Sequence, residues 1–317
     1  MQGVILAAGK GSRLHPITTK RSKAMLPILG RPVVERVMET LWANGVREFI
    51  LVVSPEDTDI RRYFREESPL EAKVEFVIQE KRLGMANALA CAASLVEGDF
   101  ILSACDNLMS ADHIAEMMQV YQAGPDINGV MSLQRATPQE IPRVGVVTMN
   151  GRWITRVIEK PSLEEAPTNI ATLPLYIFSV RLLDYLPRVP LSPRGEYEIQ
   201  DAIQMLIDER GRVCGVFTDH RLDLTGPQDL LAINRHYLVN GHDQPQLAPF
   251  TVGKNTHLIT PLRIEEGTTI GPDCVIGPRV YIERDCRIGQ GVTIKDAVVL
   301  RESVIEDGAV VVGEVVS

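Results

Sequence analysis

The sequence predicts an α/β protein in which a large mixed-sheet domain is followed by a short parallel β-helix. Three observations lead to this prediction. Up to residue 240, short apolar runs alternate with stretches of helical periodicity, which is typical of β-α units packed around a mostly parallel sheet. The segment 240–250 is polar, contains prolines and shows no period. Beyond it, aliphatic residues return at every sixth position.

The first domain opens with a strand and a helix that the pattern defines well. Residues 4–8 form an apolar run that predicts a buried strand. The helix that follows carries Pro32 near its first turn and Gly45 at its end, the positions where these residues are favoured. Further elements are expected as strands at 49–54, 74–78 and 100–106, with a helix at 87–96. Later strands are expected with fewer helices between them, at 129–133, 144–149, 153–160 and 173–179. This second half predicts an antiparallel extension of the sheet.

The last part of the chain has a period of six. The first position of each hexad is aliphatic, at Val252, Leu258, Ile264, Ile270, Ile276, Ile282, Ile288 and Ile294. The fifth position is small or aliphatic, at Thr256, Leu262, Thr268, Cys274, Val280, Cys286, Val292, Val298, Val304 and Val310. Glu306 breaks the first-position rule. This repeat predicts three flat sheets that coil around a dry core. The expected domains are therefore 1–240 and 250–317.

Composition limits the classes of function. Of 317 residues, 45% are hydrophobic and 23% charged, and the net charge is −8. These values exclude long disorder and argue against a broad basic surface for nucleic acid, so an anionic substrate needs a local basic pocket. With no leader pattern and no long apolar run, we expect a cytoplasmic protein without a membrane partner. The five scattered cysteines are expected to be free buried thiols, which leaves metal binding to carboxylates.

A glycine-rich segment follows the first predicted strand. It passes through Gly9 and Gly11 and places Arg13 and Lys23 just beyond. Such a turn can direct backbone N–H groups at phosphate oxygens, which the two cations neutralise. Its spacing does not fit a P-loop, and a dinucleotide-binding fingerprint would need a third glycine where Leu14 stands.

Residues 4–28 resemble the signature of the sugar-1-phosphate nucleotidyltransferases, the NDP-sugar pyrophosphorylases, with their Ala-Ala-Gly-x-Gly-x-Arg-Leu-x-Pro-Leu-Thr and later Pro-Lys-x-Leu-Pro sequences. The resemblance extends over nearly the whole first domain. Further matching segments follow in the family's order, at 79–86, 103–107, 143–147, 158–161, Asn169, 175–178, 195–203 and Asp223 with Gly226 and Pro227. The resemblance implies a Rossmann-like α/β domain and, as in several members, a C-terminal left-handed β-helix of hexapeptide repeats.

The resemblance also implies roles for individual residues. The implied nucleotide-binding residues are Leu6, Ala7, Ala8, Gly9, Gly11, Gln79 and Gly84. The implied catalytic residues are Arg13 and Lys23, which hold the triphosphate, and Asp106. The implied sugar-phosphate site consists of Gly145, Glu159, Lys160 and Asn169, with Glu196 as a weaker candidate. Asp106 and Asp223 are the implied ligands of Mg²⁺, the expected cofactor, because this cation prefers oxygen ligands. His15 and Arg21 are expected to be rim residues of the first motif.

The implied reaction transfers a nucleotidyl group from a nucleoside triphosphate, with UTP or dTTP favoured, to a sugar 1-phosphate of the glucose type, and releases pyrophosphate. A homo-oligomer is expected. Two alternatives stay open. Departures from the family pattern at Pro174, Arg221 and Thr225 motivate a regulatory subunit that binds nucleotide or NDP-sugar without turnover. A bifunctional uridylyltransferase/acetyltransferase is the second, although the short repeat holds a single histidine, His257.

Overall fold

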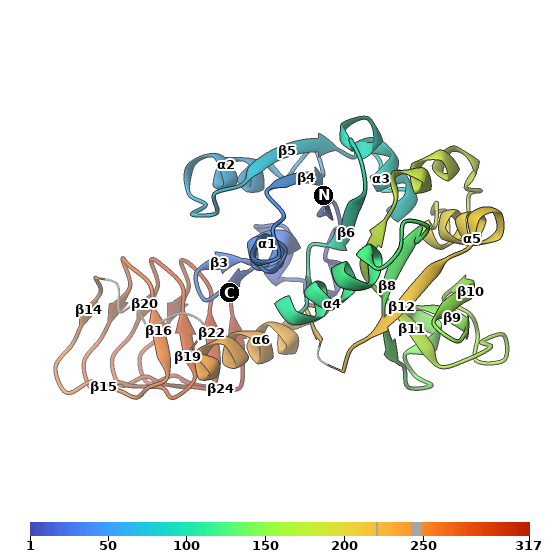
Figure 1. Cartoon of the computed structure of the whole chain (residues 1–317). Helices are drawn as coiled ribbons and strands as arrows, with labels where there is room; N and C mark the ends of the chain where they lie inside the picture. Colours follow the sequence, from blue (N-terminus) through green and yellow to red (C-terminus); the bar gives the residue numbers. More distant parts are fainter. Residues whose placement is uncertain (220, 242–248) are drawn as a thin grey trace. The chain divides into compact units, whose positions relative to one another are not determined.

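The computed structural model describes residues 1–219, 221–241 and 249–317, so most of the expected linker lies outside the described residues. By its internal contacts the chain forms two compact units (Figure 1). The first unit combines Met1–Gly9 with Val34–Arg221, and the second combines Lys10–Val33 with Leu222–Ser317. The glycine-rich segment thus divides between the units directly after Gly9. Each unit is described separately.

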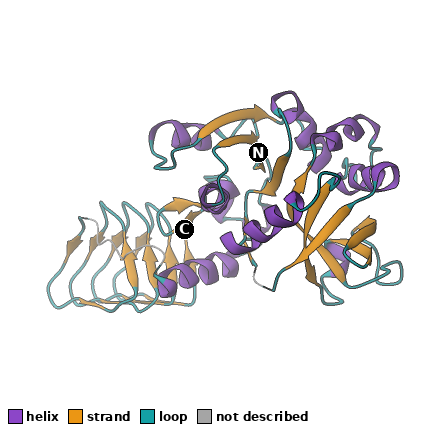
Figure 2. Ribbon diagram, in the orientation of Figure 1, coloured by secondary structure: helices purple, strands orange, loops and turns teal. Residues whose placement is uncertain are grey.

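The first unit is built on one nine-stranded mixed sheet (Figure 2). In spatial order its strands are β5 (Lys73–Ile78), β4 (Glu48–Val53), β1 (Gln2–Leu6), β6 (Phe100–Ala104), β11 (Ile170–Phe178), β8 (Gly129–Arg135), β12 (Val213–Phe217), β10 (Trp153–Glu159) and β9 (Gly145–Asn150). The first four strands are mutually parallel. β11 runs antiparallel to β6 and β8, and β9 and β10 form an antiparallel pair. The predicted antiparallel extension is confirmed.

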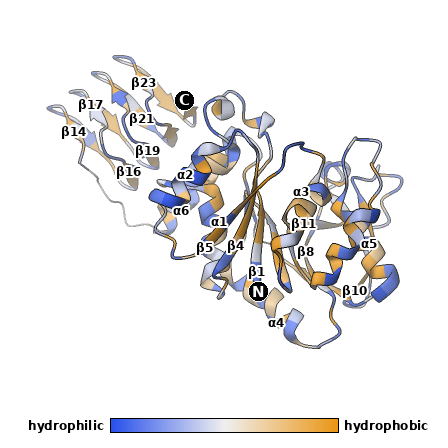
Figure 3. Ribbon diagram, turned by 90° about the horizontal axis from the view of Figure 1, so that it is seen from above, coloured by the Kyte–Doolittle hydropathy of each residue, from blue (hydrophilic) through white to orange (hydrophobic). Residues whose placement is uncertain are grey.

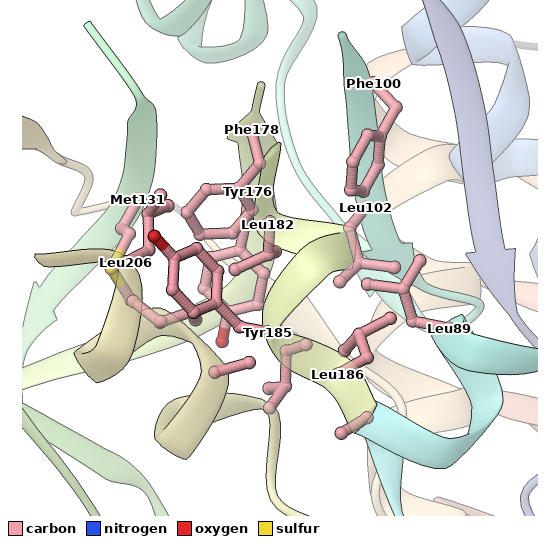
Figure 4. Close-up of a cluster of buried hydrophobic side chains, with 14 of the residues drawn as sticks. Leu89, Phe100, Leu102, Met131, Tyr176, Phe178, Leu182, Tyr185, Leu186 and Leu206 are labelled. Atoms are coloured by element: carbon pink, nitrogen blue, oxygen red, sulfur yellow. The ribbon is translucent and has the colours of Figure 1, made fainter. Parts of the chain in front are cut away.

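Helices cover this sheet, and the apolar residues of its strands form the core. The helices are α1 (Val33–Ala43), α2 (Thr58–Glu66), α3 (Met85–Ala92), α4 (Ala111–Gln122) and α5 (Ile199–Arg210), with a short strand β7 (Asn107–Leu108) and 3₁₀ turns at Ala93–Leu95, Ile141–Arg143 and Val180–Arg188. α1 begins directly after Pro32, as predicted. Figure 3 shows β1 and β4 coloured as hydrophobic. Figure 4 shows Leu102, Tyr176, Phe178 and Leu182 packed together in the largest core cluster of this unit.

Among the described residues, the second unit contains the rest of the glycine-rich segment, one α-helix and the C-terminal strands. Residues 10–33 form three 3₁₀ turns and a two-stranded hairpin: η1 (Ser12–Leu14), η2 (Ile17–Thr19), η3 (Lys23–Met25), β2 (Pro27–Ile28) and β3 (Arg31–Pro32). We call residues 10–33 the phosphate segment, after its predicted role. β13 (Leu222–Asp223) and α6 (Pro227–Asn240) lead towards the C-terminal strands.

Residues 251–316, the C-terminal β region, form three parallel four-stranded sheets. The first is β14 (Thr251–Val252), β17 (Thr269–Ile270), β20 (Arg287–Ile288) and β23 (Val304–Ile305). The second is β15 (His257–Leu258), β18 (Val275–Ile276), β21 (Thr293–Lys295) and β24 (Val310–Val312). The third is β16 (Leu262–Ile264), β19 (Val280–Ile282), β22 (Ala297–Val299) and β25 (Val315–Val316). The arrangement is consistent with a parallel β-helix whose core is built from the predicted aliphatic residues.

The expected register of the repeat is wrong beyond Ile294. Thr269 pairs with Arg287, 18 residues later, whereas Arg287 pairs with Val304, only 17 residues later. One residue is therefore missing from the last coil, and because strand side chains alternate between faces, the loss moves the core positions by one. Val304 and Val310, predicted to face the core, are 60% and 69% exposed, whereas the neighbouring residues Ile305 and Val311 are buried. Val298 is buried outside this core cluster, which contains Ala297 and Val299 instead. Val298 lies in β22, the strand against which α6 packs.

The structure confirms the expectation for the cysteines in most respects. All five are free, and four of them are buried, whereas Cys91 is partly exposed. Among the described residues, no helix is long and apolar enough to cross a lipid bilayer.

Candidate functional site

The predicted nucleotide-binding residues of the first unit lie at one edge of its sheet. β5, β4, β1 and β6 are parallel neighbours, and their ends lie level with one another: Ile78 pairs with Val53, and Leu6 pairs with Val52 and Ala104. Gln79, the run from Ala7 to Gly9, and Asp106 therefore all follow the carboxyl ends of these strands. This edge is where open α/β sheets bind ligands.

The start of the glycine-rich segment is held to the strands beside it. The amide of Ala7 donates to the carbonyl of Val52 at 2.8 Å, and the amide of Cys105 donates to Leu6 at 3.2 Å. Arg82 Nε donates to the carbonyl of Ala8 at 2.6 Å, while its Nη2 contacts Glu56 at 3.1 Å. The sequence analysis did not single out Arg82, although it lies inside a segment that resembles the family. The backbone leading into Gly9 is thus fixed on both sides.

Gln79 is buried and oriented by the turn that follows it. Its Nε2 donates to Asn87 Oδ1 at 2.8 Å and to the carbonyl of Gly84 at 3.3 Å. Both bonds use the amide nitrogen, so Oε1 is the atom suited to accept a hydrogen bond from a base edge. Gly84 has a φ of +94°, and a Cβ there would lie 2.6 Å from the carbonyl oxygen of Tyr197. The glycine is therefore required by the close approach of Tyr197.

In the second unit, the phosphate segment folds back so that Lys23 meets Gly11. Gly11 has a φ of +62°, and a Cβ there would lie only 2.9 Å from Lys23 Cβ. Thr18 Oγ1 and the amide of Leu14 both donate to the carbonyl of Gly11, at 3.0 and 2.9 Å. Arg13 lies in η1, within the same turn, and is exposed. The structure thus brings together the predicted phosphate-binding residues of this unit.

The predicted sugar-side residues meet on the β9–β10 pair of the first unit. Gly145 of β9 is the register partner of Glu159 of β10. A Cβ on Gly145 would lie 2.8 Å from Thr172 Oγ1, 3.1 Å from Glu159 Oε2 and 3.2 Å from Gln200 Nε2. Three polar atoms therefore surround a backbone position that has no side chain. Thr172 and Gln200 are buried, and sequence reasoning assigned neither of them a role.

Glu159 carries an unsatisfied oxygen. Its Oε1 pairs with Lys160 Nζ at 3.1 Å, whereas Oε2 is buried and has no hydrogen-bond partner among the described residues. Burial raises the pKa of Glu159, and the charge of Lys160 opposes that shift. Leaving a buried acceptor unsatisfied is costly, so this oxygen is suited to a hydroxyl donor from a ligand. Asn169 is exposed, and its Oδ1 accepts from Arg135 Nη1 at 3.3 Å.

The two predicted metal ligands have the chemistry that Mg²⁺ requires. Asp106 is half-buried in the turn between β6 and β7 of the first unit. In the second unit, Asp223 ends β13, and Thr225 Oγ1 donates to its Oδ2 at 3.0 Å. Within the described parts of the chain, no three His, Cys, Asp or Glu residues are grouped as a metal site. Each of the two aspartates carries a carboxylate of the kind that binds Mg²⁺, which commonly keeps water and substrate phosphate as its other ligands.

Two departures from the family pattern have structural explanations. The register of β11 against β8 shifts between Thr172 and Tyr176, where Pro174 lies, and proline is tolerated at such irregularities because it cannot donate to the ladder. Arg221 Nε donates to Asn107 Oδ1 at 3.2 Å. The residue next to Asp106 is therefore bonded to a guanidinium, a contact that the sequence pattern did not reveal.

Comparison with known proteins agrees with the resemblance noted in the sequence. Residues 2–240 match the nucleotidyl transferase family, and residues 258–317 match the GMPPB C-terminal domain. The bifunctional protein GlmU of Methanococcus maripaludis is 33% identical over 86% of this chain and 62% of its own length. The UTP–glucose-1-phosphate uridylyltransferase AglF of Haloferax volcanii is 31% identical over 72% of this chain and 93% of its own length. The glucose-1-phosphate thymidylyltransferase of Streptomyces griseus is 28% identical over 98% of this chain and 85% of its own length.

Solved structures agree at the level of the fold. A UDP-glucose pyrophosphorylase in complex with UDP-glucose superimposes with a TM-score of 0.67 at 21% identity, covering 75% of this chain and 98% of the other. The chain spans only 54% to 62% of the length of three Methanococcus maripaludis relatives named GlmU. The family match nevertheless covers most of the chain, and the parallel strands, the glycine-rich turn and the polar residues at the sheet edge agree with it. The chain belongs to the nucleotidyl transferase family.

Proposed function

We propose that this protein is a sugar-1-phosphate nucleotidyltransferase that uses UTP or dTTP and a sugar 1-phosphate of the glucose type. The observation that carries the proposal is the gathering of Ala7 to Gly9, Gln79 and Asp106 at the carboxyl ends of four parallel strands. The preference for uracil or thymine rests on the overall sequence pattern, which resembles the branches that use these bases. Gln79 is compatible with it, because its Oε1 is suited to accept from the N3–H of either base. The activities for which AglF and the Streptomyces griseus relative are named agree with this choice.

In the proposed reaction, a phosphate oxygen of the sugar 1-phosphate bonds to the α-phosphorus, and the bond from that phosphorus to the bridging oxygen of pyrophosphate breaks. The protein has little covalent work to do, because phosphoryl-type transfer depends on in-line positioning and charge stabilisation. Arg13, Lys23 and the amides near Gly9 and Gly11 neutralise the triphosphate. Mg²⁺, held by Asp106 and Asp223, would supply further charge stabilisation at the phosphates.

On the sugar side, Glu159 and Lys160 bind different parts of the sugar 1-phosphate. The buried Oε2 of Glu159 accepts from a sugar hydroxyl, which provides the partner that this oxygen lacks within the chain. Lys160 binds the sugar phosphate as a point charge. The absence of a side chain at Gly145 lets Thr172 Oγ1 and Glu159 Oε2 approach the backbone of β9 closely. Asn169 and Glu196 are further candidates for hydroxyl contacts.

Three further statements belong to this proposal. The catalytic domain spans residues 1–240 and the repeat domain residues 250–317, in agreement with the two family matches. The C-terminal β region is a left-handed coil of hexapeptide repeats, and the protein forms a homo-oligomer. Light scattering tests the proposed homo-oligomer, because it reports the mass of the assembly directly.

The test is pyrophosphate release from the purified protein with Mg²⁺. UTP and dTTP are each supplied with glucose 1-phosphate, and ATP, CTP and GTP serve as comparison nucleotides. We expect release only when a nucleotide and the sugar phosphate are both present. If a folded protein releases no pyrophosphate with any pair but binds UTP or dTTP in a thermal-shift assay, the regulatory alternative replaces this proposal.

A further inference from the structure

The phosphate segment packs with the C-terminal β region, although more than two hundred residues separate them in sequence. Both belong to the second compact unit. Leu14, Leu26, Ile28 and Leu29 of the segment are completely buried. These apolar residues anchor the segment, but they do not determine where its cations point. Polar contacts on either side of Lys23, at Arg21 and at Leu29–Gly30, restrain the segment more specifically.

The first polar contact is a buried ion pair. Arg21 Nη1 and Nη2 donate to Glu283 Oε1 and Oε2 at 2.8 and 2.9 Å, and the two side chains are only 7% and 11% exposed. Glu283 follows β19, and its Oε2 also accepts from the backbone amide of Arg301 at 2.7 Å. The C-terminal β region therefore fixes the carboxylate independently of Arg21. A bidentate pair of this kind restrains both the position and the plane of the guanidinium.

The second polar contact lies at the other end of the segment. The amide of Gly30 donates to the hydroxyl of Tyr281 at 3.0 Å, and Tyr281 is completely buried in β19. The amide of Leu29 donates to Asn234 Oδ1 at 3.0 Å, and Asn234 Nδ2 donates to the carbonyl of Pro27 at 3.1 Å. Asn234 lies in α6 and is also buried. The stretch from Arg21 to Gly30 is thus held at both ends.

Lys23 lies between these two anchors. It is two residues beyond Arg21, and its Cβ lies against the α-carbon of Gly11, beside the turn that carries Arg13. A rotation or shift of the segment at Arg21 therefore moves Lys23 relative to Gly11. Because charge stabilisation depends on cations placed in advance of the reaction, the geometry at Arg21 has consequences for the predicted triphosphate site.

We propose that Glu283 and Tyr281 of the C-terminal β region, acting through Arg21 and Gly30, are positioning residues for the phosphate segment. Neither residue contacts substrate. The C-terminal β region is then a working part of the nucleotide site, and nucleotide binding and the packing of this region stabilise each other, since coupling between two equilibria is reciprocal. The effect on catalysis rests on the proposed nucleotidyltransferase function, whereas the effect on the segment itself does not.

The test compares Glu283→Gln with a matched control, Asp296→Asn, in the full-length chain. Asp296 forms ion pairs with Arg279, whose Nη2 lies 2.8 Å away, and with Arg235 at 3.3 Å. This variant therefore also removes a carboxylate from an ion-pair cluster of the second unit, but at residues outside the phosphate segment. Both variants are expected to lower Tm, so stability alone does not distinguish a positioning role from a structural one.

Two readouts distinguish them. In hydrogen–deuterium exchange without substrate, we expect Glu283→Gln to increase exchange in peptides covering residues 10–33, and Asp296→Asn to leave them unchanged. In pyrophosphate release, we expect Glu283→Gln to raise the KM for UTP or dTTP on the order of tenfold, with the KM for glucose 1-phosphate changed less than about twofold. Combining it with Arg21→Gln should add little further effect, because the two residues act as one unit.

The proposal is overturned if Glu283→Gln lowers Tm but leaves both the exchange of residues 10–33 and the KM for the nucleotide at the level of the control. If Glu283→Gln does not fold, Tyr281→Phe, which removes only the hydroxyl that accepts from Gly30, gives the same comparison. If the wild-type protein shows no turnover, the proposed function fails, and the exchange measurement alone decides the positioning role.

Discussion

Replacing Gly11 by alanine tests how closely the phosphate segment constrains Lys23. A Cβ at this position would lie 2.9 Å from Lys23 Cβ and 3.2 Å from Thr18 Cγ2. Carbon atoms in contact need about 3.5–4.0 Å, so Lys23 must move by about 0.6–1.1 Å. A misplacement of about 1 Å in an active site can cost about 10²-fold in rate. The φ of +62° adds about 1–2 kcal/mol of backbone strain for a residue with a Cβ.

The strain and the displacement can be separated with Gly151→Ala. Gly151 lies in the turn between β9 and β10 with a φ of +59°, and no atom lies within 4 Å of a Cβ built there. In urea unfolding, we expect Gly151→Ala to lose about 1–2 kcal/mol from backbone strain, and Gly11→Ala to lose at least as much. In pyrophosphate release, only Gly11→Ala should lose kcat/KM for UTP, by about 10²-fold. Equal activity in the two variants would refute the reasoning, because it would mean that the crowding of Lys23 has no consequence.

Three other outcomes are expected. Asp106→Asn should lower kcat by about 10²-fold or more and raise the half-saturating Mg²⁺ concentration in a titration of pyrophosphate release, whereas unchanged turnover would contradict the metal assignment. Glu159→Gln should raise the KM for glucose 1-phosphate about tenfold or more. Burial raises the pKa of Glu159 in the folded state. The stability that this residue contributes is therefore complete below its unfolded pKa and is lost as the pH rises through its folded pKa. When Tm is measured across pH 4–8, Glu159→Gln should abolish this part of the decrease in Tm. Ile305 is buried and Val304 is exposed, so Ile305→Ala should cost about 2–5 kcal/mol of unfolding free energy and Val304→Ala less than about 0.5 kcal/mol. A larger loss for Val304→Ala in urea unfolding would instead support the register expected from strict hexads.

The fold was predictable where burial determines the pattern of the sequence. The central strands of the first unit are buried almost throughout, and their apolar runs predicted them to within two residues. α2 was not identified, because it is short and mostly charged: Ile60 is its only buried residue, although Ile60, Tyr63 and Phe64 do follow a helical spacing. The antiparallel strands were recognisable from the lack of intervening helices, but their spatial order was not, since β-sheet order depends on contacts distant in sequence.

The repeat shows how a strict period can mislead at one deletion. Strand residues alternate between two faces, so the loss of a single residue exchanges the core-facing and outward-facing sets. The signal was present in the sequence, because Ile305 and Val311 each directly follow an aliphatic residue at the expected position. Two adjacent valines or isoleucines satisfy either register equally well by hydrophobicity. The strand pairings, such as that of Arg287 with Val304, and the burial of Ile305 and Val311 show which register holds.

The residues of the candidate site could be proposed from the sequence, but the residues that support them could not. The motif resemblance identified Gly11, Lys23 and Glu159, which have chemistry of their own. Arg82, Asn87 and Thr172, in contrast, act by holding a backbone or a neighbouring side chain. The spacing of residues in the sequence cannot identify such supporting residues, because their partners lie on other helices, strands or loops. Their roles become visible only when distances are known.

Arg21 is the clearest case of a role that local sequence conceals. In sequence it is one of several cations in a polar segment, which favoured a rim position. In the structure its side chain is 7% exposed and paired with Glu283, 262 residues away. The difference matters energetically, because an exposed ion pair contributes about 0–1 kcal/mol, whereas removing one partner of a buried pair costs about 3–5 kcal/mol. A cation that costs this much to unpair cannot move freely with the rest of the segment. Because a single residue, Ser22, separates Arg21 from Lys23, the position of Arg21 is transmitted to the predicted triphosphate site.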